Sequence, residues 1–401
     1  MTDLTMKTID TVKKFDRAFF TIGRPIKQTY IKDRLNENGV VEAYIDVKDI
    51  AEQAGLNWEV TKRPILTTSF DEPYTLNPEP LLPNGTVQTQ RLRIVLKDFF
   101  YGKSVEPDLA DEIKRLLNAT ENSFIPHEND YSILRKDTNI PFGTFSGVYT
   151  PLDNEECIRI IEPLLLSGKA EIVRGGFFNH GANCWIIARL SKNMIIGSEE
   201  IGQYIKISWS HDGSEMLSAT FIGNSSRDNI QINPNLESAA VRIEIKHTTN
   251  ARKRMEVASS LLCKGEHYFN KLETVLTDLI NSPWTQSEME NYLQALFPEK
   301  DTATDRKNDK MKEKKDNIMR LYKTTNTDID NTKYAAFTSV VKWCDYEKTC
   351  RITKKTSFAD EETQRAESRT QSIWMKNGSG RKIKDEAFAL IVNPSKKKSV
   401  N

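Results

Sequence analysis

The chain has 401 residues, enough for two or three domains of about 150 residues, and its 38% apolar and 28% charged residues are typical of folded proteins and exclude general disorder. Its formal net charge is only +1, but residues 1–200 hold 24 Lys and Arg against 29 Asp and Glu, whereas residues 201–401 hold 33 against 27. The sequence has no apolar run of roughly eighteen residues and no apolar block of a secretory signal, so we expect a cytoplasmic protein that does not span a membrane.

The chain is expected to begin with an arm and a small α+β part. Residues 1–45 show no sustained hydrophobic period and are interpreted as an N-terminal arm or irregular lead-in. Within residues 46–140, Asp46 can cap a helix over residues 47–54 that Gly55 ends. The rest of this part is predicted to hold strands over residues 58–66, 91–99 and around 131–134, a proline-rich loop over 70–85, and an acidic helix that begins near Pro107.

Residues 141–282 are predicted to form a central sheet followed by a long helix. Turn residues between apolar runs, Asp212 and Gly213 above all, indicate β-hairpins. Between residues 250 and 280 the apolar positions recur at helical spacing, which predicts one long helix. The other predicted elements are a helix over 153–166 and strands over 170–178, 184–190, 204–210, 215–222 and 240–247.

Residues 283–401 are predicted to be a helical C-terminal region with a basic tail. Thr285 and Glu288 form a capping-box pattern at the start of its first helix. Strands that precede helices indicate an α+β fold, with a central, mostly antiparallel sheet and a long basic helix followed by the helical C-terminal region. Further helices are expected near residues 305–322, 334–346, 361–374 and 382–392.

Three segments together resemble one known family. They are VKDIAEQAGLNWEVTKRPI (residues 47–65), SWSHDGS (208–214) followed by IEIKHTTNARKRMEVA (243–258), and ESRTQSIWMKNGSGRKIKDEAFALI (367–391). In this order, over roughly residues 45–393, they resemble the phage/plasmid-like protein family, which is defined by domain of unknown function 932. The resemblance implies a protein of a phage or plasmid that is concerned with DNA replication, recombination or host takeover, and it implies no specific activity. The segment TFIGNSSRDNIQINPNL (220–236) departs from the Val-rich strand and Cys-Asn-Thr segment of the family.

The start of the long helix is the most informative candidate site. Arg252, Lys253 and Arg254 fall in its first turn, where free amides and the helix dipole already present positive charge, so each cation there is disfavoured by about 0.3–1 kcal/mol. A cationic helix start is suited to phosphate. Arg242 and Lys246, on one face of the preceding strand, extend this basic surface. The alternative interpretation is a solvated charged face that neighbouring glutamates neutralise.

Trp209, His211 and Arg227 lie at or near the second predicted hairpin. Aromatic and arginine side chains of this kind stack on bases in proteins that bind single strands, which makes these three residues candidates for nucleic-acid binding. The alternative is that the hairpin is only a turn, in which Asp212 and Gly213 supply the backbone conformation.

The sequence names no catalytic residue, no metal site and no cofactor. Its five cysteines include no CxxC pair, which indicates reduced thiols and packing roles. A catalytic site that assembles only from residues distant in the sequence is left open.

Together these patterns favour a nucleic-acid-binding protein that prefers single-stranded DNA, acts in annealing, recombination or replication, and forms a homo-oligomer. The alternative is a host-takeover or protein-interaction factor that binds no nucleic acid.

Overall fold

The computed structural model describes residues 22–68, 124–236, 242–246, 253, 265–299, 305–324, 329–350 and 361–393. The chain forms two compact units, one of residues 1–57 with 152–401 and one of residues 58–151. The sequence suggested other boundaries, at residues 45, 140 and 282. The larger unit is made of two segments that are separated in the sequence, and no local sequence pattern marks such a unit.

The unit of residues 58–151 contains a three-stranded antiparallel sheet, with β5 between β4 and β6. Two of its aromatic rings lie near cations: the Arg135 guanidinium lies 4.4 Å from the Trp58 ring, and Lys62 Nζ lies 4.3 Å from the Tyr131 ring. β4 and β5 confirm the predicted strands near 58–66 and 131–134. The predicted strand 91–99 and the predicted helix near Pro107 lie outside the described residues. The strands are β4 (Val60–Thr68), β5 (Phe124–Arg135) and β6 (Pro141–Ser146).

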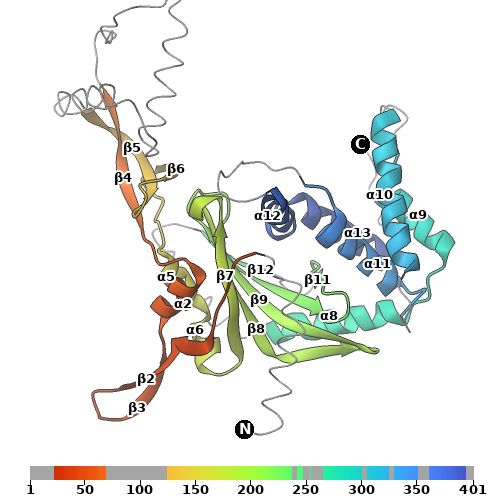
Figure 1. Cartoon of the computed structure of the whole chain (residues 1–401), viewed down its shortest axis with the longest axis horizontal. Helices are drawn as coiled ribbons and strands as arrows, with labels where there is room; N and C mark the ends of the chain where they lie inside the picture. The colour runs from red at the N-terminus through yellow and green to blue at the C-terminus, as the bar shows by residue number, and fades with distance from the viewer. Residues whose placement is uncertain are drawn as a thin grey trace, which may run out of the picture. The chain divides into compact units, whose positions relative to one another are not determined.

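The other unit is built on a seven-stranded antiparallel sheet, whose strands from β7 to β12 are drawn in shades of green in Figure 1. Its path runs β1-β7-β8-β9-β10-β11, and β12 also pairs with β10. Both predicted hairpins and the predicted strand near 240–247 are confirmed. The strands are β1 (Arg24–Pro25), β7 (Ala170–Phe178), β8 (Asn183–Ile196), β9 (Glu199–Ser210), β10 (Leu217–Ser225), β11 (Gln231–Ile232) and β12 (Arg242–Ile245).

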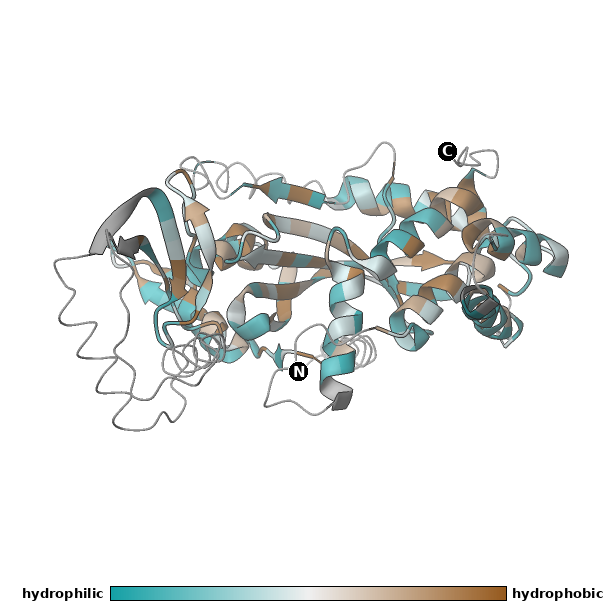
Figure 2. Ribbon diagram, turned by 90° about the horizontal axis from the view of Figure 1, so that it is seen from above, coloured by the Kyte–Doolittle hydropathy of each residue, from teal (hydrophilic) through white to brown (hydrophobic). Residues whose placement is uncertain are grey.

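Alternation along β9 gives this sheet two different faces. Ile205 and Ile207 point to one face and Lys206 and Ser208 to the other, because successive side chains of a strand point in opposite directions. The apolar face packs on α8 (Gly265–Ile280), where the Phe221 ring lies 5.7 Å from Tyr268 and 5.8 Å from Phe269. Figure 2 shows brown, apolar residues both along strands and on helices.

The face of the sheet that carries Lys206 and Ser208 is only partly apolar. The helix α12 (Glu361–Trp374) packs on its apolar part. Ile373 and Trp374 pack there with Trp185, Ile187 and Tyr204, and the Trp185 and Trp374 rings meet edge to face at 4.9 Å. The polar remainder of this face forms the candidate site described below.

The helical C-terminal region is confirmed. Thr285 and Glu288 form the predicted capping box, with Glu288 N donating to Thr285 Oγ1 and Thr285 N to the Glu288 carboxylate. None of the helices in the described ranges is both long and apolar enough to cross a membrane. The helices are α9 (Gln286–Leu296), α10 (Asp305–Lys323), α11 (Lys333–Lys342), the π-helical turn η4 (Trp343–Glu347), α12, and α13 (Ser379–Val392).

The N-terminal and central helices agree with the sequence in part. Asp46 caps α2 (Val47–Ala54) through its side chain, and Gly55 ends it at φ 73°, as predicted. Residues 22–45 are not irregular throughout, because β1, η1 (Gln28–Tyr30), and the hairpin of β2 (Ile31–Leu35) and β3 (Val41–Ile45) lie within them. The predicted helix 153–166 is three short pieces: α5 (Asn154–Ile158), η2 (Arg159–Ile161) and α6 (Glu162–Leu166).

Candidate functional site

Three polar side chains form a row across adjacent strands of the mixed face. Lys206 of β9 lies opposite Thr220 of β10, and Thr220 lies opposite Arg242 of β12. Directly opposed residues of antiparallel strands place their side chains on the same face. The next row along the strands, Ser208, Ser218 and Glu244, is also polar.

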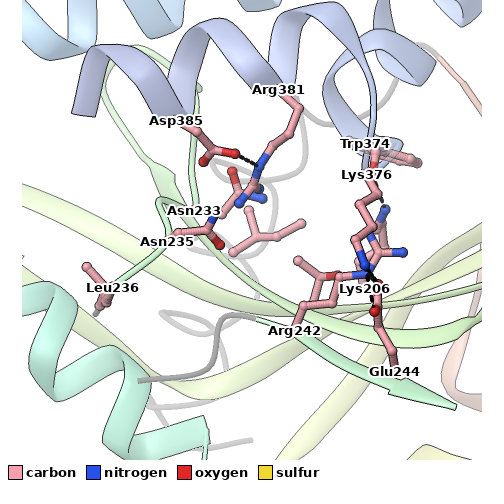
Figure 3. A pocket seen from close by; sticks show the side chains of 12 residues that line it. Lys206, Asn233, Asn235, Leu236, Arg242, Glu244, Trp374, Lys376, Arg381 and Asp385 are labelled. Carbon is pink, nitrogen blue, oxygen red and sulfur yellow. Dashed lines mark hydrogen bonds and ion pairs between the residues drawn. The ribbon is translucent and has the colours of Figure 1, made fainter. Parts of the chain in front are cut away.

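A pocket of about 310 Å³ lies over this row, and we call it the cationic pocket. In Figure 3 its floor is the sheet, and Arg381 and Asp385 reach it from α13. Its cationic side chains outnumber its carboxylates by four to two. The lining residues are Lys206, Thr220, Ile222, Asn233, Asn235, Leu236, Arg242, Glu244, Trp374, Lys376, Arg381 and Asp385.

Lys206 is the deepest of these cations, with 2% of the residue exposed. Its Nζ donates to the Trp374 carbonyl oxygen at 3.2 Å and lies 5.1 Å from the Trp374 ring. Within the described part of the chain, no carboxylate lies at ion-pair distance from this nitrogen. Burial lowers the pKa of Lys206 to about 7, although nearby Glu215 acts to raise it.

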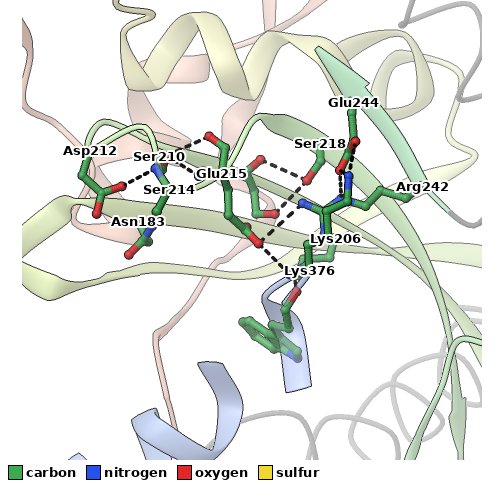
Figure 4. Close-up of polar contacts among 12 residues, drawn as sticks. Asn183, Lys206, Ser210, Asp212, Ser214, Glu215, Ser218, Arg242, Glu244 and Lys376 are labelled. Carbon is green, nitrogen blue, oxygen red and sulfur yellow. Dashed lines mark hydrogen bonds and ion pairs between the residues drawn. The ribbon is translucent and has the colours of Figure 1, made fainter. Parts of the chain in front are cut away.

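The other three cations have carboxylate partners. Arg242 Nε lies 3.1 Å from Glu244, and Lys376 Nζ lies 2.8 Å from the same carboxylate. Arg381 pairs with Asp385 one turn along α13, at 2.9 Å. These ion pairs, drawn in part in Figure 4, hold the cationic heads around the pocket in defined positions.

Glu215 fixes the end of the pocket nearest the β9–β10 turn. It accepts from the Lys376 backbone N at 2.9 Å and lies 3.6 Å from Arg242. Its own backbone is held by Ser210, because Glu215 N donates to Ser210 Oγ at 2.9 Å and Ser210 Oγ donates to Glu215 O at 2.7 Å. The turn therefore positions one carboxylate between the sheet and the segment that joins α12 to α13 (Figure 4).

The basic residues predicted from the sequence are only partly placed. Arg242 lines the cationic pocket, and Lys246, just beyond β12, is exposed. Lys253 is helical and exposed, whereas Arg252 and Arg254 lie outside the described residues. The long basic helix is therefore described only at Lys253 and over α8, and its cationic start stays a prediction.

The structure contradicts base stacking by Trp209 and His211. Both are buried, at 1% and 0% exposure, and both rings bond to one amide: Trp209 Nε1 donates to Asn154 Oδ1 at 2.9 Å, and His211 Nε2 lies 3.0 Å from the same oxygen. Trp209 shares the apolar face with Ile207, so its ring belongs to the core.

Arg227 is not at the β9–β10 turn. It follows β10, beyond the opposite end of that strand, and pairs with the buried Glu199 at 3.0 Å. Gly213 at φ 73° confirms that the β9–β10 turn uses the predicted backbone conformation.

Sequence reasoning missed Lys206 and Lys376. The signal for Lys206 was present, because YIKISWS alternates and puts a lysine on the face opposite two isoleucines. Lys376 carried no such signal, because it joins the pocket only through the return of α12 and α13 to the sheet. Among the described residues, no cluster of three or more His, Cys, Asp or Glu side chains could hold a metal ion.

The comparisons with known proteins give one match. The family model of a domain of unknown function, DUF932, matches residues 141–374, more than half of the chain. No curated protein and no solved structure matches.

Proposed function

The chain belongs to the DUF932 family, whose function is unknown, and we propose that this protein binds nucleic acid through the cationic pocket, with single-stranded DNA favoured. In this proposal the protein serves the recombination or replication of a phage or plasmid, as a single-strand binding or annealing factor. It acts in the cytoplasm of the bacterial host and assembles into a homo-oligomer on DNA.

The single observation that carries the proposal is a buried lysine at the base of a cationic pocket that has no carboxylate at ion-pair distance among the described residues. A desolvated cation is costly unless an anion pairs with it, and in the described ranges Lys206 has a carbonyl oxygen as its hydrogen-bond acceptor. Arg242 and Arg381 line the same pocket, and guanidinium groups suit phosphate oxygens because they present several donors in one plane.

A binding titration tests the proposal. Fluorescence anisotropy with single-stranded DNA, duplex DNA and RNA, each at two salt concentrations, should give the tightest binding for single-stranded DNA. The logarithm of the affinity should fall with that of the salt concentration, by about 0.7 for each phosphate contact on a single strand. If no nucleic acid binds at low salt and the protein stays monomeric with DNA present, the proposal is wrong.

The predicted basic start of the long helix offers a second test of the same function. Arg252→Glu with Arg254→Glu should abolish the salt-sensitive part of binding without unfolding the protein, because two phosphate-pairing charges are reversed. Circular dichroism checks the fold. Lys382→Glu, at an exposed residue of α13 outside the cationic pocket, is the matched control and should change affinity much less. Unchanged affinity in the double variant would remove this helix from the binding surface.

The alternative, a host-takeover or protein-interaction factor, is favoured by one observation. The β2–β3 hairpin exposes apolar residues on one face, where Ile31, Leu35 and Val41 are 46%, 71% and 63% exposed. Exposed apolar groups of this kind mark interaction surfaces. A pull-down that recovers one host protein after nuclease treatment, and loses it in Leu35→Ser with Val41→Ser, would support this function.

A further inference from the structure

The cationic pocket contains polar groups that the fold leaves unsatisfied. Within the described chain, the Thr220 hydroxyl is buried without a hydrogen-bond partner, and it lies directly opposite Lys206 on the neighbouring strand. Lys206 Nζ has one hydrogen bond, to a carbonyl, and can donate two more. Buried polar groups are normally paired, so a donor pair left open at the floor of a pocket points to a bound acceptor.

The depth of these donors restricts which phosphate can reach them. A phosphodiester inside a strand has two substituents, and both chains must pass the walls of a pocket of about 310 Å³, which is at the small end of ligand sites. A phosphate monoester has one substituent and three terminal oxygens, so it can enter with its oxygens first. It also carries a charge of about −1.5 to −2 near neutral pH, against −1 for a diester.

The charges around the pocket favour the more highly charged ligand. Arg242, Lys376 and Arg381 are each offset by Glu244, Glu215 or Asp385, so the positive charge that remains is on Lys206, at the floor, in the protonated form that a bound anion favours. Asn233, which is buried, and Asn235, which is exposed, line the pocket from the segment after β11, and their side chains can donate to a sugar or a base. The strongest attraction is therefore at the deepest point.

We propose that the cationic pocket binds a phosphate monoester, the terminal phosphate of a DNA strand, with Lys206 and Thr220 as the innermost donors. This inference rests on the proposed nucleic-acid binding and adds that the protein recognises strand ends. A free mononucleotide has the same monoester and should compete for the pocket.

The test compares strands that differ only at their ends. Anisotropy is measured for one single-stranded sequence as a closed circle, as a linear strand with hydroxyl ends, and with a phosphate at the 5′ or the 3′ end. One phosphorylated strand should bind on the order of tenfold tighter than the hydroxyl strand, which corresponds to one charge-assisted contact. A nucleoside 5′-monophosphate should remove this gain, and the unphosphorylated nucleoside should not.

Variants assign the gain to the pocket. Lys206→Met and, separately, Thr220→Val should lose the preference for the phosphorylated strand. Lys382→Met, the exposed neighbour of Arg381, should keep this preference. Thermal melting identifies a variant that fails to fold, and Thr220→Val then decides, because it changes one atom of a side chain.

Three outcomes separate the two proposals. Equal binding of the circle and of all linear strands overturns end recognition and leaves nucleic-acid binding intact. An end preference that survives in both variants also overturns the assignment to this pocket. If no strand binds but the mononucleotide stabilises the wild type and not Thr220→Val, the proposed function fails and the monoester site is supported.

Discussion

Two buried lysines of the same unit, Lys206 and Lys384, lie in opposite electrostatic surroundings. Lys384 of α13 is 4% exposed, pairs with the buried Asp345 of η4, and donates to the Gln231 carbonyl oxygen at 3.0 Å. Asp345 also accepts from Gln231 N at 2.9 Å, so the pair joins α13, η4 and β11. Lys206 is buried more deeply; its Nζ contacts the Trp374 carbonyl oxygen and ring, and among the described residues no carboxylate lies at ion-pair distance from it.

The difference separates a structural cation from a candidate binding cation. Where a charge serves the fold, the chain supplies a counter-charge and satisfies the remaining donors, as at Lys384. Where the chain buries a cation beside a cavity without an ion-pair partner, the desolvation cost of that cation can be offset by an anionic ligand that binds in the cavity. The predictions below test this division, beginning with the structural lysine.

Lys384→Met should destabilise the protein by about 3–5 kcal/mol, because it leaves the Asp345 carboxylate buried without its partner. The free energy of unfolding from urea titration measures the loss. Lys384→Met combined with Asp345→Leu should recover most of it, because the unpaired charge is then gone. A loss below about 1 kcal/mol in the single variant would mean that the pair contributes little, and would remove the contrast with Lys206.

Lys206 should give the protein a stability that rises with pH between about 7 and 10.5. In this window the unfolded chain binds a proton that the folded chain does not, because burial lowers the pKa of Lys206 to about 7. The free energy of unfolding should therefore increase by up to about 1.4 kcal/mol per pH unit as pH rises, and the gain should be absent below pH 7.

Lys206→Met is the control for this slope. The variant should be at least as stable as the wild type at neutral pH and should lack the slope that Lys206 contributes. The groups that face Lys206 are Glu215, which raises its pKa, and Arg242 and Arg381, which lower it, so Glu215→Gln should extend the lower limit of the window to lower pH. A wild-type slope that persists in Lys206→Met would assign it to other groups.

Much of the fold was predictable because its signals are local. The cap at Asp46, the stop at Gly55 and the capping box of Thr285 and Glu288 each depend on residues within one helix, and all three are confirmed. The hairpins followed from turn chemistry between alternating runs. The hairpin of β2 and β3 was missed because β2 holds three consecutive charged residues and is exposed throughout, so it shows no alternation of apolar and polar residues.

The candidate site was less predictable because it is assembled across the chain. Arg242 was identified, but Trp374 reaches Lys206 from 168 positions away, a contact that no local pattern reveals. Trp209 and His211 were assigned to a surface although alternation places Trp209 with Ile207 in the core. The segment 220–236 supplies Thr220, Asn233 and Asn235 to the pocket.

The smallest predicted effect is on stability, and it has the opposite sign from the first. Thr220→Val should stabilise the ligand-free protein by about 1 kcal/mol, because it replaces a buried hydroxyl that no described residue satisfies with a methyl group of similar size. Phe221→Ala, one position along β10 on the apolar face, should instead cost about 3–5 kcal/mol through lost packing on α8. Urea titration of both variants measures the contrast between the two faces. If Thr220→Val destabilised the protein, its hydroxyl would have an internal partner, and the pocket would lose one of the two donors assigned to the phosphate.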